Sequence, residues 1–87
     1  MNSKTNKSFW KHYWTLPPEI RQRAIQAYRI WLENPSHPSL FFKRVKESQP
    51  IYSVRIGLAY RALGLLKGDT VTWFWIGKHD EYDELIK

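Results

Sequence analysis

Basic and aromatic side chains alternate along the second half of the chain, and this combination is suited to binding nucleic acid. Seven of the basic residues fall in predicted strands or at their ends: Lys43, Arg44, Lys46, Arg55, Arg61, Lys78 and His79. Cations bind a phosphate backbone, and aromatic rings stack on unpaired bases. Neighbouring strands of an antiparallel sheet place residues about 5 Å apart, so several of these cations can converge on one face. The alternative is a solvated basic surface that only keeps a small protein soluble.

Arg55 is the sharpest single candidate among these cations. It falls between Val54 and Ile56 in a predicted strand, where an unpaired buried charge is costly. Its guanidinium must therefore reach a carboxylate, a groove or a ligand. A pair with Glu47 or with the acidic C-terminal residues would make Arg55 structural, whereas a ligand would make it functional.

Several kinds of chemistry are excluded by composition. The chain has no cysteine, which removes disulfides, cysteine-ligated zinc and cysteine catalysis. It carries no Gly-rich phosphate loop, no Gly-x-Ser-x-Gly and no His-Glu-x-x-His motif. His79, Glu81 and Asp83 come nearest to a metal-ligand set, but a polar histidine at a strand end is the simpler interpretation, so we expect no metal and no cofactor.

The charge distribution favours an acidic partner. The formal net charge is +6 over 87 residues, and the last eight residues carry four of the eight acidic side chains. The preceding 79 residues are therefore strongly basic, which suits nucleic acid or an acidic protein. No apolar run approaches the roughly 20 residues of a membrane span, and residues 1–14 contain no apolar signal core, so we expect a cytoplasmic protein.

The elements that must position these residues follow from periodicity and from turn residues. Residues 1–6 are polar and predicted to be flexible. Apolar positions from Ile20 to Leu32 recur at helical spacing, with prolines before them and Asn34-Pro35 after them, which predicts a long helix. Alternation and turn signals predict strands over 8–14, 42–46, 51–57, 60–66 and 70–76, and a short helix over 79–87.

This order predicts an α+β fold in one domain spanning residues 1–87. We expect an N-terminal strand and a long helix, or a helical hairpin, packed on a twisted antiparallel sheet and closed by a short C-terminal helix or tail. The strands over 60–66 and 70–76 are apolar on both faces, so they should be central.

Three segments of the chain resemble the RelE/ParE superfamily of toxins from type II toxin–antitoxin systems. The segments are LPPEIRQRAIQAYRIWLENPSHPSLFFKRV at 16–45, YSVRIGLAYRALG at 52–64 and WFWIGKHDEYDELI at 73–86. Within them, an Arg-x-Gly precedes a Tyr-Arg, and a Gly-x-His-x-x-Tyr ends the match. The resemblance implies helices against an antiparallel sheet and a cognate antitoxin that wraps the toxin.

The resemblance also implies an activity, which for RelE-like members is metal-independent cleavage of ribosome-bound mRNA with translation inhibition and growth arrest. Transfer of the phosphate to the adjacent 2′-hydroxyl needs a base, an acid and cations. By resemblance, Arg55 stabilises the phosphate, Lys78 holds the basic position at the end of the last strand, His79 is the acid or base, and Tyr82 stacks or relays a proton. The remaining cations hold the RNA backbone: Lys43, Arg44, Lys46 and Arg61. Arg61, at the Tyr-Arg position, fits a structural role equally well.

Two other functions stay open within the superfamily. ParE-like members inhibit DNA gyrase without a nuclease site, and an inactive or orphan member would act only as a binding protein. The sequence departs from the nuclease pattern because four carboxylates surround His79 and Tyr82: Asp80, Glu81, Asp83 and Glu84. They would repel RNA unless they point away. Acidic residues in the first turn would instead favour a helix that begins at His79.

Overall fold

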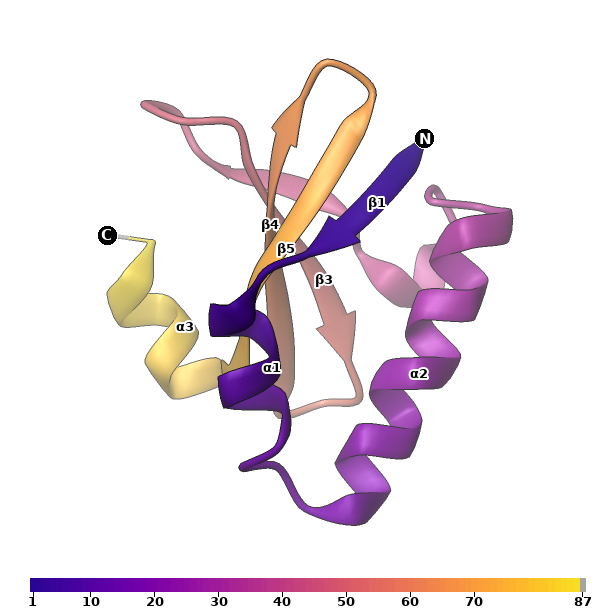
Figure 1. Ribbon diagram of the computed structural model, residues 1–87, viewed down its shortest axis with the longest axis vertical. Helices are drawn as coiled ribbons and strands as arrows, with labels where there is room; N and C mark the ends of the chain where they lie inside the picture. The colour runs from indigo at the N-terminus through magenta and orange to yellow at the C-terminus, as the bar shows by residue number, and fades with distance from the viewer. Residues whose placement is uncertain (87) are drawn as a thin grey trace.

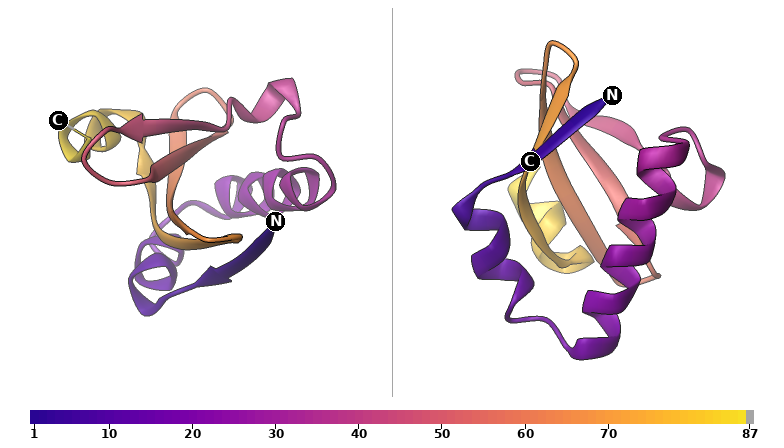
Figure 2. Two further views of the ribbon diagram at one scale, coloured as in Figure 1. Left: turned by 90° about the horizontal axis from the view of Figure 1, so that it is seen from above. Right: turned by 45° about the vertical axis from the view of Figure 1, so that its right-hand side comes forward.

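A computed structural model describes residues 1–86, which form an α+β fold with a five-stranded sheet between helices (Figures 1 and 2). The strands are β1 (Asn2–Thr5), β2 (Lys43–Lys46), β3 (Ile51–Ile56), β4 (Tyr60–Lys67) and β5 (Thr70–Lys78). The α-helices are α1 (Lys7–Tyr13), α2 (Pro18–Glu33) and α3 (His79–Leu85), and a short 3-10 helix spans Pro38–Leu40. The spatial order of the strands is β1-β5-β4-β3-β2.

The first strand corrects the prediction for residues 1–6. Those residues are not irregular, because Asn2–Thr5 pairs parallel with β5, from Asn2 opposite Thr70 to Thr5 opposite Trp73. The sheet is therefore mixed rather than wholly antiparallel. A polar segment can form this edge strand because the pairing uses backbone groups, such as the Asn2 N–H that donates to the Asp69 carbonyl at 2.8 Å.

The strand predicted over residues 8–14 is wrong, since Lys7–Tyr13 is helix α1. Asn6 caps the helix, and its Oδ1 accepts from the Phe9 N–H at 3.0 Å. Phe9 and Tyr13 lie one turn apart with stacked rings 6.0 Å between centroids. Helical packing of these rings against the core outweighs the aromatic preference for strands.

Helix α2 confirms the predicted long helix and covers one face of the sheet. Proline occupies its first turn, and the Asn34 N–H donates to the Ile30 carbonyl at its C-terminal end. Its buried side is formed by Ala24, Ala27 and Trp31. The small side chains of the two alanines allow the helix to lie near the sheet. The Trp31 ring packs edge-on against the Trp73 ring, with 5.4 Å between the ring centroids.

The four later strands and the last helix also confirm the prediction. β4 is the central strand and β5 lies beside it, as their apolar character on both faces indicated. β5 extends to Lys78, two residues beyond the predicted end, and α3 follows at once. The predicted end of that helix at residue 87 lies outside the described residues.

The sheet has an apolar core on each face. Helices cover both of these faces (Figure 2). On one face, α1 and α2 pack over Val54, Ile56, Trp73 and Ile76. On the other face, α3 places Tyr82 on Leu63 and Trp75. In the described part of the chain, no helix combines the length and apolar character needed to span a membrane.

Candidate functional site

The strand register places three of the predicted cations on the sheet face that carries α3. Arg55 lies directly opposite Arg61, and Lys43 lies opposite Ser53, two residues before Arg55. Paired residues point to the same face, and so do residues two apart on one strand. Lys43 is therefore about 7 Å along the strands from the row that contains the two arginines.

Arg55 and Arg61 are two partly buried cations side by side. Nη1 of Arg61 donates to the Tyr60 carbonyl at 2.8 Å, and Nε of Arg55 donates to the Gly57 carbonyl at 3.1 Å. The Arg55 guanidinium also lies 5.1 Å from the centre of the Phe41 ring. Each bond uses one of five N–H donors, which leaves geometry suited to an oxyanion. Among the described residues, Arg55 forms no ion pair with Glu47, in contrast to the structural role considered for it.

The pKa of Arg61 reflects its partial burial and its position beside Arg55. Burial lowers the pKa of Arg61 first, and the neighbouring charge of Arg55 lowers it further. Tyr82 and Asp83 act in the opposite direction and raise that pKa. Arg61 stays protonated, because an arginine pKa starts so high. The fold therefore holds two like charges together, an arrangement that a bound phosphate would relieve.

The β5–α3 junction adds Lys78 and His79 to this end of the sheet. A cavity of about 360 Å³ is lined there by Leu58, Ala59, Arg61, Lys78, His79 and Asp80. The His79 N–H donates to the Ala59 carbonyl at 2.7 Å, which ties the start of α3 to the β3–β4 turn. Three of the predicted site residues, Arg61, Lys78 and His79, thus share one depression.

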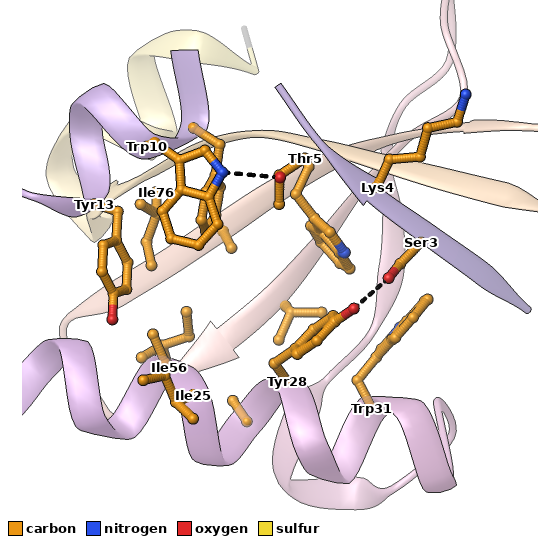
Figure 3. A pocket seen from close by; sticks show the side chains of 16 residues that line it. Ser3, Lys4, Thr5, Trp10, Tyr13, Ile25, Tyr28, Trp31, Ile56 and Ile76 are labelled. Carbon is orange, nitrogen blue, oxygen red and sulfur yellow. Dashed lines mark hydrogen bonds between the residues drawn. The ribbon is translucent and has the colours of Figure 1, made fainter. Parts of the chain in front are cut away.

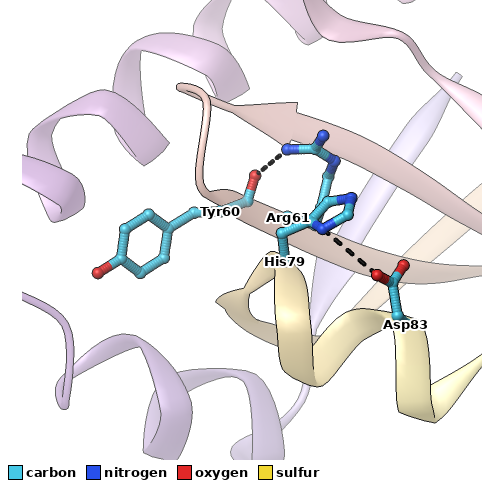
Figure 4. A network of polar contacts seen from close by, with 4 residues as sticks. All are labelled: Tyr60, Arg61, His79 and Asp83. Atoms are coloured by element: carbon cyan, nitrogen blue, oxygen red, sulfur yellow. Dashed lines mark hydrogen bonds and ion pairs between the residues drawn. The ribbon is translucent and has the colours of Figure 1, made fainter.

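Asp83 holds the His79 imidazole (Figure 4). Its Oδ2 lies 3.4 Å from Nδ1 of His79, one turn further along α3. A carboxylate near Nδ1 attracts a proton on that nitrogen and favours this orientation of the ring, in a pair whose side chains are about half exposed. Sequence reasoning treated Asp83 as a source of repulsion. The i, i+4 spacing on a helix that begins at His79 was the signal that could have identified it as a partner.

Tyr82 is buried, which does not suit the first of its two predicted roles, stacking on RNA. It is 6% exposed and packs with Leu63 and Trp75 in the core beneath α3. Its ring centre lies 5.6 Å from that of His79. Tyr82 therefore holds α3 on the sheet, and its ring packs beside that of His79.

The other two cations of β2 lie away from the arginine pair. Arg44 is opposite Tyr52, on the other face, and its guanidinium donates to the carbonyls of Lys46 and Glu47 at 2.9 and 2.8 Å. It therefore closes the β2–β3 turn. Lys46 is opposite Ile51, at the far end of β3 from Arg55. The structure brings neither residue to the depression at the β5–α3 junction.

Arg23 of α2 is a cation that sequence reasoning missed. It lines a second depression of about 500 Å³ together with Arg55, Gly57 and Leu58. Gly57 has a φ of +62°, and a Cβ there would meet Nη1 of Arg23 at 3.0 Å. In the sequence Arg23 belongs to the polar side of an amphipathic helix, so nothing marked it as part of a site.

The described residues form no group of three or more His, Cys, Asp or Glu side chains that could hold a metal ion. The cations instead border two adjoining depressions that meet at Leu58, which is 80% exposed. Such a surface can bind a polyanion, and at His79 it can exchange a proton.

Comparison with known proteins identifies the family. The model of the ParE-like toxin domain matches residues 18–84. The chain belongs to this family. It is thus a toxin of the RelE/ParE superfamily, as the sequence resemblance implied. No curated protein matches the chain.

Solved structures of toxins share the ParE-like fold of this chain. A chain of the RelB–RelE antitoxin–toxin complex from Methanococcus jannaschii has a TM-score of 0.76 at 21% identity, over 97% of this chain and 99% of that chain. YafQ from E. coli has a TM-score of 0.74 at 8% identity, over 93% and 96%. A chain of the RelE–RelB complex from Pyrococcus horikoshii has a TM-score of 0.70 at 16% identity, over 88% and 92%. These likenesses concern the fold.

Proposed function

We propose that this ParE-like domain is a RelE-like, metal-independent endoribonuclease that cuts ribosome-bound mRNA in the cytoplasm, and that residues 1–87 act as one toxin domain. The observation that supports the proposal is the depression shared by Arg61, Lys78 and His79, with Asp83 beside His79 and with Arg55 opposite Arg61 on the neighbouring strand. Each of the two guanidiniums donates to a backbone carbonyl and has further N–H groups suited to a phosphate in RNA.

The chemistry assigned to this site is transfer within the RNA chain. The 2′-hydroxyl oxygen attacks the adjacent phosphorus, its proton goes to a base, and the P–O5′ bond breaks as the 5′ oxygen takes up a proton. Nε2 of His79 serves as the acid or base, with Asp83 on Nδ1 to orient it. Arg55, Arg61 and Lys78 stabilise the charge that develops on the phosphate.

The remaining predicted residues support binding in this proposal. Lys43 extends the cationic face along the sheet, and Arg23 extends it toward α2. Arg44 and Lys46 contact RNA only further along the strand, and Tyr82 acts by positioning α3. Of the residues predicted to be catalytic, the proposal keeps Arg55, Lys78 and His79. It adds Arg61 to them.

An antitoxin partner is part of the same proposal. Two of the similar structures are complexes of a RelE with a RelB, and the one from Methanococcus jannaschii is described as an antitoxin–toxin complex. The strongly basic surface of this chain and its exposed apolar side chains, such as Trp14 at 64% and Leu58 at 80%, suit an acidic amphipathic segment. Co-expression with the product of an adjacent small reading frame should yield a stable complex and restore growth.

Induced expression in a bacterial host tests the nuclease. We expect growth arrest and new mRNA 5′ ends within translated codons, mapped by primer extension. The double variant Arg55→Ala/His79→Ala should lose both effects while its circular dichroism spectrum stays that of the parent. Lys67→Ala, on the far end of β4, is the matched control and should remain toxic. A folded double variant that is still fully toxic would refute the mechanism.

A ParE-like gyrase inhibitor is the second candidate function. The observation in its favour is Asp80, an acidic residue that lines the same depression as Arg61 and Lys78 and whose negative charge opposes RNA binding there. This candidate predicts growth arrest without new mRNA ends and inhibition of supercoiling by purified toxin. Lack of toxicity in a folded, soluble protein would instead favour an inactive member that only binds its partner.

A further inference from the structure

One stripe of helix α2 forms a wall of the depression that Arg23 shares with Arg55 (the Arg23 depression). Four residues of α2 line it at the i, i+3, i+4 and i+7 spacing of one helix face: Arg23, Gln26, Ala27 and Ile30. The neighbouring stripe, with Tyr28 and Trp31, lines an apolar cavity between β1, α1 and α2 (Figure 3). Mostly aliphatic and aromatic side chains form the walls of that cavity, so of these two hollows the Arg23 depression is the one suited to an anion.

Gly57 brings the side chains of Arg23 and Arg55 to the same part of the β3–β4 turn. Its carbonyl accepts from Nε of Arg55 at 3.1 Å. Its φ is +62°, and a Cβ built on it would lie 3.0 Å from Nη1 of Arg23. Because glycine has no Cβ, the Arg23 guanidinium can lie close to the backbone of this turn. Two cations from different elements, α2 and β3, therefore lie near one backbone position.

The Arg23 depression has positive charge that no acidic side chain in its lining balances. Among the described residues that line it, Arg23 and Arg55 are the only charged ones. Gln26 adds an amide that can donate a further hydrogen bond. Asp80, in contrast, lines the depression at the β5–α3 junction. The attraction for an anion is therefore less opposed at the Arg23 depression than at the junction.

Phe41 supports Arg55 at the open edge of β3. The pairing of β2 with β3 starts at Lys43, which lies opposite Ser53, so β2 does not reach Arg55. The Arg55 guanidinium instead lies over the Phe41 ring, 5.1 Å from its centre. Phe41 has a φ of +46°, a strained backbone conformation for an aromatic residue, and such strain is concentrated at functional sites. The strained residue thus places a ring against a cation that lines the depression.

We propose that the Arg23 depression is a second phosphate subsite, which holds the phosphodiester next to the scissile one in a single RNA strand. This subsite rests on the nuclease function proposed above. Arg55 lines the Arg23 depression and lies directly opposite Arg61, which lines the depression at the β5–α3 junction. The two depressions adjoin at Leu58, so an RNA strand that passes over this exposed residue meets cations at two successive phosphates.

Binding of single-stranded RNA to the purified chain tests the subsite without cleavage. The probe is a short fluorescent 2′-O-methyl oligouridylate, which lacks the attacking hydroxyl, and its anisotropy gives Kd over a range of salt concentrations. We expect Arg23→Gln to weaken binding about three- to tenfold at low salt, the effect of one net hydrogen bond. The slope of log K against log salt should become shallower by about 0.7, the contribution of one phosphate in a single strand.

Arg29→Gln is the matched control for Arg23→Gln. Arg29 is an exposed arginine of the same helix, and it lines neither of the two depressions. Its replacement removes the same charge and should leave Kd and the salt slope near those of the parent. Arg23→Gln/Arg55→Gln should lose less than the sum of the two single variants, because both arginines contact one phosphate. A parent chain that does not bind the probe, or equal effects of Arg23→Gln and Arg29→Gln, would overturn the subsite.

Mapping of mRNA 5′ ends in cells separates failure of the subsite from failure of the nuclease. If Arg23→Gln weakens probe binding as expected but the parent produces no new 5′ ends, the subsite is supported and the nuclease is refuted. If the parent cuts mRNA but Arg23→Gln binds the probe like the parent, the subsite alone is refuted. An Arg23→Gln chain that keeps its RNA affinity and loses affinity for its antitoxin would assign the depression to an acidic protein segment and overturn the proposal.

Discussion

Replacing Arg61 by glutamine should stabilise the fold while it weakens the proposed RNA site. Arg61 lies directly opposite Arg55 on the neighbouring strand, and burial lowers its pKa, followed by the charge of Arg55. Like charges in such a pair destabilise a sheet. Arg61→Gln removes the repulsion and keeps an amide that can donate to the Tyr60 carbonyl in place of Nη1.

The size of the effect follows from the spacing of the pair. Two unit charges about 5 Å apart, the spacing of directly opposed side chains, repel by about 0.8 kcal/mol at the dielectric constant of water and by about 3 kcal/mol at an effective value of 20, and the partial exposure of both arginines favours the lower figure. The pull of Asp83 on Arg61 is lost at the same time and offsets part of this. We therefore expect a net gain of about 0.5–1 kcal/mol, or a rise of about 2–8 °C in Tm for a domain of this length.

Thermal unfolding at two salt concentrations checks this reasoning. The rise in Tm of Arg61→Gln should be largest at low salt. It should shrink in 1 M salt, where the Debye length falls to about 3 Å. Lys67→Gln lowers the net charge equally but has Thr70 opposite it, so it should leave Tm nearly unchanged. An Arg61→Gln protein that melts at or below the parent temperature, or a gain matched by Lys67→Gln, would show that the Arg55–Arg61 repulsion is unimportant.

Three further changes test other parts of the structure. Asn6→Ala should cost about 1 kcal/mol in urea unfolding because α1 loses its cap to Phe9, and Asn6→Ser should restore most of it. Gly64→Ala should destabilise by about 1–3 kcal/mol, since its Cβ would lie 2.8 Å from Cε3 of Trp73; an unchanged unfolding midpoint would contradict this packing. Asp80→Asn should strengthen RNA binding severalfold at low salt because a carboxylate leaves the depression, and unaltered affinity would place the RNA elsewhere.

The sequence predicted the elements in which apolar side chains recur at helical spacing or alternate along a strand. Helix α2 has apolar positions at helical spacing and prolines at its start, and the later strands alternate between turns. The segment Lys7–Tyr13 carries aromatic residues that suit a strand, and its helix depends on the Asn6 cap and on packing against β5. β1 could not be predicted from side chains, because backbone pairing with β5 defines it.

The candidate site was predicted as a set of residues but not as a geometry. Arg55 and Arg61 belong to adjoining strands, and their direct opposition depends on the register that the β3–β4 turn fixes. Lys78 and His79 reach the same end because α3 starts immediately after β5. Arg23 contributes from a helix far away in sequence, and no local pattern distinguishes it from a solvated arginine.

The acidic residues of α3 have contacts that the sequence did not indicate. The sequence indicated repulsion of RNA or a favoured helix start, whereas in the structure Asp83 also lies near cations of the site. Asp83 binds the imidazole of His79 and raises the pKa of Arg61, so it offsets part of the repulsion within the cationic cluster. Asp80 lies in the first turn, where the helix dipole favours a negative charge. Asp80 therefore favours the start of α3, and the helix in turn holds His79 in the same depression as Arg61. For the proposed nuclease, these carboxylates weaken the attraction for RNA and at the same time order the acid–base group at His79.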